Sequence, residues 1–396
     1  MTLRARATLV AATAATLSLA LAVPAFAAPS GSGSGSGSGS TSTSAGGDTH
    51  SATRDAMRAV VQGGVPGVTA IARDTEGTWR ATEGVGNLRT GAPRSADDRY
   101  RVGSITKTFV ATVLLQLEAE GELDLDDTVD TWLPGLVTGN GNDGRNITVR
   151  QLLNHTSGIF NYTSDEPFAR EIFLKEGFDR NRYRTWAPEE LVAVAMRHEP
   201  NFTPGSSWSY SNTNYILAGM VIEAVTGRPY GEAIDDRIVE PLDLDDTFVP
   251  AGRPTLGTPH SRAYSKLAET SEGRSYDVTV FNPSAAGAAG EMVSDNNDLN
   301  RFMSALLRGK LLPPEQLKAM KTTIVAPGIP NATYGLGLIK QDLSCGTTVW
   351  GHGGGIHGST SESYTTGDGK HSLALNLNAD WTGDTQSIIE AEYCAD

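Results

Sequence analysis

Hydrophobic and polar positions along the chain predict a helix followed by a strand pair at its N-terminal side. Residues 48–61 have the pattern of a helix. Residues 67–72 and 79–85 have the pattern of two strands, and the polar segment 74–77 between them predicts a turn. We therefore expect the folded part of the chain to begin with one helix and two paired strands.

The middle of the chain is expected to be mostly helical. Predicted helices lie at 106–120, from 149 onward as a short segment, at 188–198, at 214–226 and at 297–307. Gly121 and Gly227 end two of them, because glycine adopts the left-handed conformation that closes a helix at little cost. Pro188 suits the first turn of another, where its missing N–H is not needed.

The C-terminal part returns to strand-like patterning. Predicted strands lie at 335–341, 347–351, 360–366 and 371–378, and a last helix lies at 384–394. The run Thr366-Gly367-Asp368-Gly369 predicts a hairpin. Strands at both ends and helices between them predict an α+β fold, with one antiparallel sheet built from both chain ends and flanked by helices. A mostly helical subdomain, roughly 110–290, is then inserted between the two halves of the sheet.

The first residues carry the pattern of an export signal. Arg4 and Arg6 precede an apolar stretch over 9–23, and Ala25-Phe26-Ala27 is a small-x-small cleavage site. We therefore expect a signal peptide over 1–27. The apolar stretch is too short for a membrane span, and no second long apolar run follows. The expectation is a secreted protein without a transmembrane segment, in the extracellular space or associated with the cell wall.

Residues 28–47 are dominated by glycine, serine and threonine, with strict Gly-Ser alternation over 31–40. Such a segment has no apolar surface to bury, so we expect a flexible linker. The folded domain is then expected over 48–396. A domain of this length is large for one core and suits a body with a helical insertion.

The charge of the chain argues against two classes of partner. The formal net charge is −14, and it becomes −16 once Arg4 and Arg6 leave with the signal peptide. Nucleic acids and anionic membranes are therefore disfavoured as partners. The acidity suits solubility outside the cell, and we expect a monomer.

The two cysteines, Cys345 and Cys394, are expected to form a disulfide, because an even count in an exported protein favours pairing. The bond would hold the last helix against the strand region near Leu343. Closing a loop of about 50 residues contributes about 4 kcal/mol in the chain-entropy account. Neither cysteine lies in a setting that would activate a thiolate.

The first candidate for chemistry lies at the start of the predicted helix 106–120. Ser104 and Lys107 are three residues apart, so a helix places them on one face. Backbone N–H groups at a helix N-terminus can hold an oxyanion. A lysine whose pKa is lowered by burial can take the serine proton. The bare S-x-x-K pattern also fits a helix cap beside a solvated lysine.

Tyr210 and Asn212 form a second candidate, after the turn-rich segment 202–208. Two residues apart in an extended stretch, they point the same way. The phenol can shuttle a proton if nearby cations lower its pKa, and the amide can hold a substrate carbonyl or the Lys107 amine. The alternative is a helix-capping loop packed under Trp208.

A third candidate is the run His352-Gly353-Gly354-Gly355, expected to follow a strand that ends near Trp350. Glycine-rich backbone lets a substrate lie against a strand and pair with its N–H and C=O groups. One alternative is a tight turn with a solvated histidine. A lipase-type oxyanion loop would need a downstream G-x-S-x-G motif, which the sequence lacks.

The remaining polar residues offer weaker candidates. His155, in Leu152-Leu153-Asn154-His155-Thr156-Ser157-Gly158, is expected to be a structural hydrogen-bonding residue. The other histidines show no metal-ligand spacing, and no Cys/His cluster suits zinc. The sequence therefore predicts no metal site and no cofactor.

Taken in order, the motifs Ser104/Lys107, Tyr210/Asn212 and His352/Gly354 resemble those of the serine β-lactamase and penicillin-binding protein superfamily. The resemblance is to the class C-like branch, which includes secreted D-alanyl-D-alanine carboxypeptidases of actinomycetes. It covers roughly 48–396, and the paired cysteines also resemble that group. Supporting segments are 100–104, 152–158, 202–212 and 286–290.

The resemblance implies an acyl-enzyme mechanism without a metal or cofactor. Ser104 would attack a carbonyl, Lys107 and Tyr210 would handle the proton, and which of them is the base stays open. Tyr210 would also protonate the leaving amine, with His352 near it. Asn212 would hold the acyl-side amide. The N–H groups of Ser104 and Gly355 would form the oxyanion hole, and His352, Gly354 and Gly355 would line the substrate.

Two positions depart from the pattern of the secreted carboxypeptidases. Gly353 stands where relatives carry a hydroxyl, and Ile339 stands where the closest carboxypeptidases have an arginine for the terminal carboxylate of the substrate. Lys340 is adjacent, but strand alternation turns it to the other face. Both differences weaken recognition of a free C-terminal carboxylate, and the H-G-G motif also resembles D-aminopeptidases.

Three functions follow from these observations. The first is a secreted serine D-alanyl-D-alanine carboxypeptidase acting on peptidoglycan-type peptides. The second is a D-aminopeptidase, an esterase or a class C-like β-lactamase, with a peptide or β-lactam as the small-molecule substrate. The third is a non-catalytic penicillin-binding-fold protein that binds the cell wall, and the intact Ser104, Lys107 and Tyr210 set argues against it.

Overall fold

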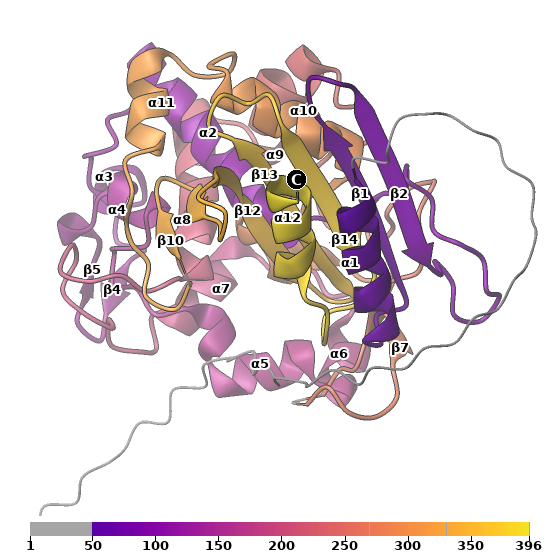
Figure 1. Ribbon diagram of the computed structural model, residues 1–396. Coiled ribbons are helices and arrows are strands. Elements are labelled where there is room, and N and C mark those ends of the chain that lie inside the picture. Colours follow the sequence, from indigo (N-terminus) through magenta and orange to yellow (C-terminus); the bar gives the residue numbers. More distant parts are fainter. Residues whose placement is uncertain (1–49, 269, 330, 396) are drawn as a thin grey trace, which may run out of the picture. The chain divides into compact units, whose positions relative to one another are not determined.

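The fold is seen in a computed structural model that describes residues 50–268, 270–329 and 331–395 (Figure 1). The expected signal peptide and linker lie outside the described residues. An eight-stranded antiparallel sheet has the strand order β2-β1-β14-β13-β12-β11-β10-β9. Its strands are β1 (Gly67–Arg73), β2 (Thr78–Gly84), β9 (Ile324–Val325), β10 (Ala332–Tyr334), β11 (Ile339–Asp342), β12 (Thr348–Ile356), β13 (Ser359–Thr366) and β14 (Ser372–Leu377).

This order confirms the predicted α+β fold with a sheet assembled from both chain ends. β1 pairs directly with β14, so strands nearly 300 residues apart in sequence are neighbours. The β13–β14 hairpin turns at Thr366–Gly369 as predicted, where the Gly369 N–H donates to the Thr366 carbonyl.

Twelve α-helices lie within the described residues. They are α1 (Ser51–Gln62), α2 (Thr106–Glu120), α3 (Val129–Trp132), α4 (Val149–Leu153), α5 (Glu166–Phe173), α6 (Lys175–Asn181), α7 (Pro188–Ala195), α8 (Asn212–Thr226), α9 (Tyr230–Ile234), α10 (Asn296–Leu307), α11 (Pro314–Met320) and α12 (Thr385–Cys394). Most of the helices belong to the insertion between β2 and β9, as the sequence predicts. Among the described residues, every helix is too short or too polar to cross a membrane.

Three two-stranded sheets complete the regular structure. They are β3 (Tyr100–Arg101) with β8 (Val293–Ser294), β4 (Thr138–Gly139) with β5 (Asn142–Asp143), and β6 (Tyr264–Ser265) with β7 (Tyr276–Asp277). The β3–β8 pair lies directly before the Ser104 segment. It ties that segment to the chain that leads into α10.

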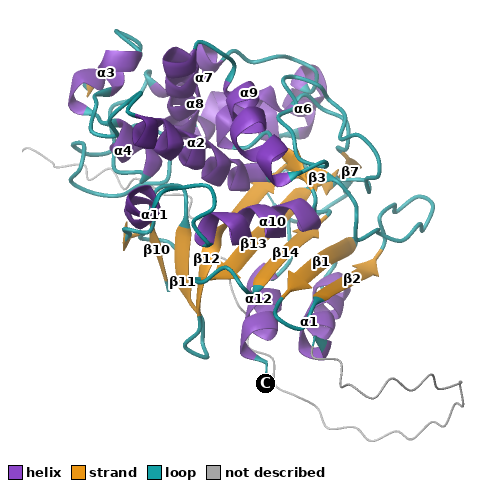
Figure 2. Ribbon diagram, turned by 90° about the horizontal axis from the view of Figure 1, so that it is seen from above, coloured by secondary structure: helices purple, strands orange, loops and turns teal. Residues whose placement is uncertain are grey.

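The large sheet separates two apolar cores. Figure 2 shows α1 and α12 on one side of the strands, and α10 and α2 on the other. On the α1 and α12 side, residues such as Met57, Leu375 and Ile388 are buried against one another. On the other side, α2 is buried nearly all round, and Phe109 stacks on Phe302 of α10 with ring centroids 3.7 Å apart.

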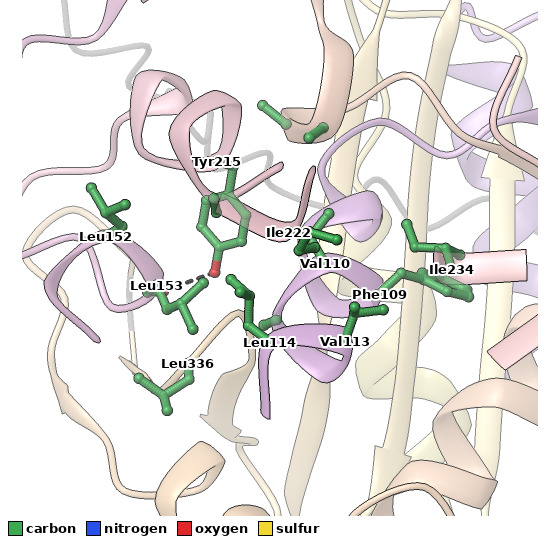
Figure 3. Packing of buried hydrophobic residues seen from close by; sticks show 14 of the residues in the cluster. Phe109, Val110, Val113, Leu114, Leu152, Leu153, Tyr215, Ile222, Ile234 and Leu336 are labelled. Carbon is green, nitrogen blue, oxygen red and sulfur yellow. Dashed lines mark hydrogen bonds between the residues drawn. The ribbon is translucent and has the colours of Figure 1, made fainter. Parts of the chain in front are cut away.

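The core around α2 holds the helix that carries Lys107 and follows Ser104. Figure 3 shows Phe109, Val113 and Leu114 of α2 within this core, with Tyr215 of α8 close by. The Tyr215 hydroxyl donates to the Leu153 carbonyl at 2.8 Å. α8 is buried on most sides, so its 15 residues form a central helix of this core.

Three of the predicted element boundaries differ from those in the structure. The strand expected to end at 351 continues to Ile356, because its glycines pair with β13 from Ser359 to Glu362. In the strand expected over 335–341, the first four residues form the turn between β10 and β11, where the Gly335 N–H donates to the Leu338 carbonyl, and only the part from Ile339 is strand. The helix predicted from 214 begins at Asn212. The helices α3, α5, α6, α9 and α11 were not predicted.

The expected disulfide is present between Cys345 and Cys394, with Cα atoms 5.5 Å apart. It joins the turn between β11 and β12 to the last residue of α12. The helix is therefore tied to the sheet near Leu343, as expected from the sequence.

Candidate active site

Ser104 lies in a short 3-10 helix, Gly103–Ile105, that leads directly into α2. Gly103 has a φ of +55°, and a Cβ there would lie 2.7 Å from the Gly355 nitrogen. A Cβ on Gly354 would lie 1.9 Å from the Val102 carbonyl oxygen and 2.9 Å from the Ser104 nitrogen. Only glycine fits these two positions, so β12 touches the turn that carries Ser104.

This contact brings together the two backbone groups expected to stabilise an oxyanion. Ser104 and Gly355 both line one cavity beside the sheet. The Ser104 N–H belongs to the turn that opens α2, where backbone N–H groups favour negative charge. The arrangement can hold an oxygen that gains charge during attack on a carbonyl.

Lys107 is fully buried and faces three oxygen atoms. Its Nζ lies 2.9 Å from Ser104 Oγ, 2.8 Å from Asn212 Oδ1 and 2.7 Å from the Ala289 carbonyl oxygen. Burial lowers the pKa of Lys107 well below its usual value of 10.5, because the charged amine loses its hydration. The side chain can therefore be a neutral amine beside the Ser104 hydroxyl.

Tyr210 lies close to both Ser104 and Lys107. Its phenol is hydrogen-bonded to Ser104, and Lys107 Nζ lies 4.8 Å from its ring centroid. Burial raises the pKa of Tyr210 above its usual value of 10.0. This direction is opposite to the lowering that a tyrosinate base would need. The two pKa directions together favour Lys107 as the base and a protonated Tyr210 as a proton donor.

Asn212 is the first residue of α8, and each of its polar groups has a partner. Its side-chain oxygen accepts from Lys107 Nζ, and its Nδ2 donates to Thr163 Oγ1 at 3.2 Å. Its backbone N–H donates to Asn161 Oδ1 at 3.0 Å. These contacts fix the amide against the lysine, and the residue also lines the cavity beside Ser104.

His352 is buried within β12 and uses both ring nitrogens inside the protein. Nδ1 lies 2.5 Å from the Gly353 carbonyl oxygen and Nε2 lies 2.9 Å from the Tyr334 hydroxyl. Because the carbonyl oxygen can only accept, Nδ1 donates to it and Nε2 accepts from Tyr334. Burial lowers the pKa of His352 to about 3, with a further contribution from Lys107. The neutral ring is 6.4 Å from the ring of Tyr210.

His155 packs against Tyr210 and is hydrogen-bonded to the residue that follows it. Its ring lies 4.3 Å from the Tyr210 ring, and its Nδ1 accepts from the Ser211 N–H at 3.2 Å. Burial lowers its pKa well below the usual value, so the ring is neutral. The residue is a structural hydrogen-bonding group, as expected from the sequence.

A largely apolar cavity of about 110 Å³ opens beside Ser104. Its walls come from α5, α6, the segment 281–290 and the end of β12. The apolar lining includes Phe168, Ile172, Phe178, Trp186, Phe281 and Ile356. Glu171 is the one carboxylate among the lining residues of the described chain. Such a cavity can take an apolar side chain next to a polar group.

The two positions that depart from the carboxypeptidase pattern, Ile339 and Gly353, lie beside an apolar core and an acidic side chain, respectively. Ile339 packs in the core that contains Tyr334 and is 7% exposed. Lys340 forms an ion pair with Asp342 at 3.1 Å. A Cβ on Gly353 would lie 2.5 Å from Glu362 Oε2, so an acidic side chain fills the space beside this glycine.

Several residues of the site were missed by sequence reasoning. Tyr334 and Thr163 reach the site from segments without a recognised motif, and the helices α5 and α6 supply much of the cavity. Only the glycine- and alanine-rich segment 286–290 carried a signal in advance. Across the residues that the structure describes, no group of three or more histidine, cysteine, aspartate or glutamate side chains could hold a metal ion.

Comparisons with known proteins find relatives over most of the chain. A family model described as Beta-lactamase matches residues 51–382. A D-stereospecific amidohydrolase from Streptomyces sp. is 59% identical, with a TM-score of 0.83, and the match covers 88% of this chain and 99% of that one. D-amino acid amidase from Ochrobactrum anthropi SV3, in complex with L-phenylalanine, is 28% identical, with a TM-score of 0.74, and the match covers 86% and 96%.

Among curated proteins, the chain is similar to esterase EstB from Burkholderia gladioli. The two are 29% identical over 273 residues, which is 64% of this chain and 68% of the esterase.

Proposed function

The chain belongs to the beta-lactamase family of serine hydrolases, which act through an acyl-enzyme, and we propose that it hydrolyses amides and short peptides of D-amino acids. The observation that carries this proposal is the contact of a buried Lys107 amine with Ser104 beside an apolar cavity. Similarity to the D-stereospecific amidohydrolase and to the D-amino acid amidase supports the choice of substrate class.

In the proposed acylation step, Ser104 Oγ attacks the carbonyl carbon of the amide. The hydroxyl proton passes to the neutral Lys107 amine, and the N–H groups of Ser104 and Gly355 hold the oxyanion. The C–N bond then breaks as Tyr210 gives its proton to the leaving nitrogen and regains one from Lys107. Ammonia or an amine departs, and the acyl group remains as an ester on Ser104.

Deacylation repeats these steps with water as the nucleophile. Water attacks the ester carbonyl, its proton passes to Lys107, and the bond to Ser104 breaks. The proton returns to Ser104 Oγ, and the D-amino acid is released. Every proton transfer in this scheme uses side chains of the chain itself.

The cavity supports an apolar D-amino acid as the acyl group. An aromatic or branched side chain would lie among Phe168, Phe281 and Ile356. Glu171 at the cavity wall would attract the free ammonium group of the substrate, although it also binds Arg180 at 2.6 Å. Asn212 would hold the acyl portion close to Ser104.

A D-alanyl-D-alanine carboxypeptidase is the second candidate, and the intact Ser104, Lys107 and Tyr210 set favours it. Against it, Ile339 and Gly353 offer no cation or hydroxyl for a terminal carboxylate. Export to the cell surface and a place near the cell wall are part of the proposal for either activity. They rest on the N-terminal sequence alone.

A substrate panel tests the proposal. D-phenylalanine amide, L-phenylalanine amide, a D-Ala-D-Ala peptide, a short acyl ester and a cephalosporin are each given to the wild type and to Ser104→Ala. We expect the wild type to prefer the D-amide, the Ser104→Ala variant to turn over none, and Ser104 alone to gain the acyl mass. Faster release of D-alanine from the D-Ala-D-Ala peptide than of ammonia from the D-amide would favour the carboxypeptidase instead.

A further inference from the structure

Glu362 is an acidic side chain that the proposed mechanism does not use, although it lies next to the strand that would bind the substrate. β13 pairs with β12 so that Glu362 is opposite Gly353. A Cβ on Gly353 would lie 2.5 Å from Glu362 Oε2 and 3.1 Å from its Cδ. The carboxylate therefore lies where a side chain at position 353 would be.

The position of the cavity shows which part of a substrate meets Glu362. Gly355 and Ile356 lead along β12 into the apolar cavity, which would take the acyl side chain. In the other direction β12 leads to Gly353 and then to Gly351, whose pair with Ile339 is the last between β11 and β12. From His352 to Ile356, no other described strand pairs with this edge of β12. The leaving group would follow this open edge.

The side chains along this edge share one face of the sheet. Ile339 is opposite Gly351, Gly353 is opposite Glu362, and alternation along β12 puts both pairs on the α12 side. Thr385, the first residue of α12, donates to Glu362 Oε1 at 2.9 Å. Within the described residues, burial and this one hydrogen bond are the influences on the Glu362 carboxyl, and no neighbouring cation contributes.

We propose that Glu362 is a specificity-determining residue, whose carboxylate disfavours leaving groups that end in a free carboxylate and favours neutral or positively charged ones. The physical reason is repulsion between like charges at a poorly hydrated site. The same face has the apolar Ile339 and two glycines, so the repulsion is not offset there. The proposal rests on the proposed function, because it needs acylation of Ser104 with the leaving group along β12.

Glu362 changes charge within the range of ordinary assays. Burial raises its pKa to about 7, since the ionised form loses hydration. Tyr364 lies on the same face of β13, and burial raises its pKa well above the usual 10.0, so it stays neutral. On α12 the charged groups are Glu390 and the more distant Glu392, with Asp384 at the helix cap, and Lys340 on β11 points to the other face. Discrimination against a carboxylate should therefore appear as pH rises through about 7.

A matched pair of substrates tests the role of Glu362. The dipeptide D-Phe-D-Ala and its C-terminal amide, D-Phe-D-Ala-NH₂, differ only in the charge at the end of the leaving group. The ratio of their kcat/KM values is measured at about pH 8.5, where a carboxyl with a pKa near 7 is ionised. Chromatography of the released D-alanine or D-alaninamide confirms that the same bond is cut.

We expect the wild type to prefer the amide, and Glu362→Gln to reduce that preference by about tenfold, mainly through faster cleavage of the acid. Glutamine keeps the size of the side chain and its hydrogen bond with Thr385. Glu390→Gln is the matched control, since it removes one negative charge from α12 beside Ser344. Its ratio should equal that of the wild type.

An unchanged ratio in a Glu362→Gln protein that folds and is acylated at Ser104 would overturn the inference. If that variant does not fold, the pH dependence of the wild-type protein tests the inference instead. Its preference for the amide should rise between about pH 6 and pH 8, and a constant preference would reject the role of Glu362. Failure of the wild type to cleave either dipeptide or to form an acyl-enzyme would instead count against the proposed function.

Discussion

Lys107 Nζ lies 2.9 Å from Ser104 Oγ. It also contacts two carbonyl oxygens, the side-chain oxygen of Asn212 and the backbone oxygen of Ala289. Carbonyl oxygens can only accept, so a neutral amine points its two N–H groups at them. Its lone pair then faces the serine hydroxyl. A chain with no histidine next to its nucleophile thereby gains a base that is already oriented.

The first prediction concerns the pH dependence of acylation. The ordinary pKa of lysine is 10.5, and burial lowers the pKa of Lys107 well below that value. Above its pKa the amine is neutral and can accept the Ser104 proton, and below it the amine is protonated and cannot. We therefore expect kcat/KM to fall as pH is lowered through this pKa. An uncharged acyl ester is the substrate, so that only groups of the protein titrate.

Lys107→Met should lower kcat/KM for this ester by about 10²- to 10⁴-fold, the usual range for loss of a general base. Lys340→Met is the control, because Lys340 is ion-paired with Asp342 away from the site. It should keep the wild-type pH profile. If the residual kcat/KM of Lys107→Met still falls at low pH as that of the wild type does, another group is the base.

The second prediction separates proton donation by Tyr210 from attack by Ser104. An amine leaving group needs a proton before it departs, and the phenolate of an activated ester does not. Tyr210→Phe should therefore slow amide hydrolysis by about 10²-fold or more, and hydrolysis of a nitrophenyl ester much less. Steady-state kinetics on both substrates measure the difference. Equal losses on both substrates would assign Tyr210 to the attack step.

The third prediction compares two neighbouring glycines of β12. A Cβ on Gly354 would lie 1.9 Å from the Val102 carbonyl oxygen, whereas a Cβ on Gly355 would meet nothing within 4 Å. Gly354→Ala should lower the free energy of unfolding by about 1–3 kcal/mol or more, as overpacking does. Gly355→Ala should change it by less than about 0.5 kcal/mol. Denaturant unfolding followed by circular dichroism measures both. Equal stabilities would show that β12 does not press on the Ser104 turn.

The fourth prediction concerns the disulfide between Cys345 and Cys394, which are 49 residues apart in sequence. Its loss frees the unfolded chain, so the double variant Cys345→Ser/Cys394→Ser should lose about 2–4 kcal/mol of unfolding free energy. Reductant should destabilise the wild type by a similar amount. It should have no effect on the double variant, and that comparison separates the disulfide from other effects of the reductant.

Local patterns in the sequence were enough to predict much of the fold and the candidate site. Ser104 and Lys107 share a helical face because of their spacing, and the glycine at 121 ends α2 where it was expected to. The β13–β14 hairpin follows from its Gly-Asp-Gly turn. These features depend on neighbours within a few residues.

Other features depend on which distant segments lie together. The run of three glycines after His352 resembles a turn when read alone, yet pairing with β13 keeps it extended to Ile356. The cavity needs α5 and α6, whose short sequences carry no motif. The low pKa of Lys107 needs the surroundings that bury it, and no pattern around residue 107 states how deep that burial is.

The sequence alone determined the identity and order of the reactive groups, because S-x-x-K, Y-x-N and H-x-G are local motifs set by residue type and spacing. Only the tertiary structure decided their protonation and their surroundings. Burial sets the direction of the pKa shifts of Lys107 and Tyr210, and strand register places Glu362 beside Gly353. Electrostatic energy depends on distance and hydration in three dimensions, and those quantities exist only once the chain is folded.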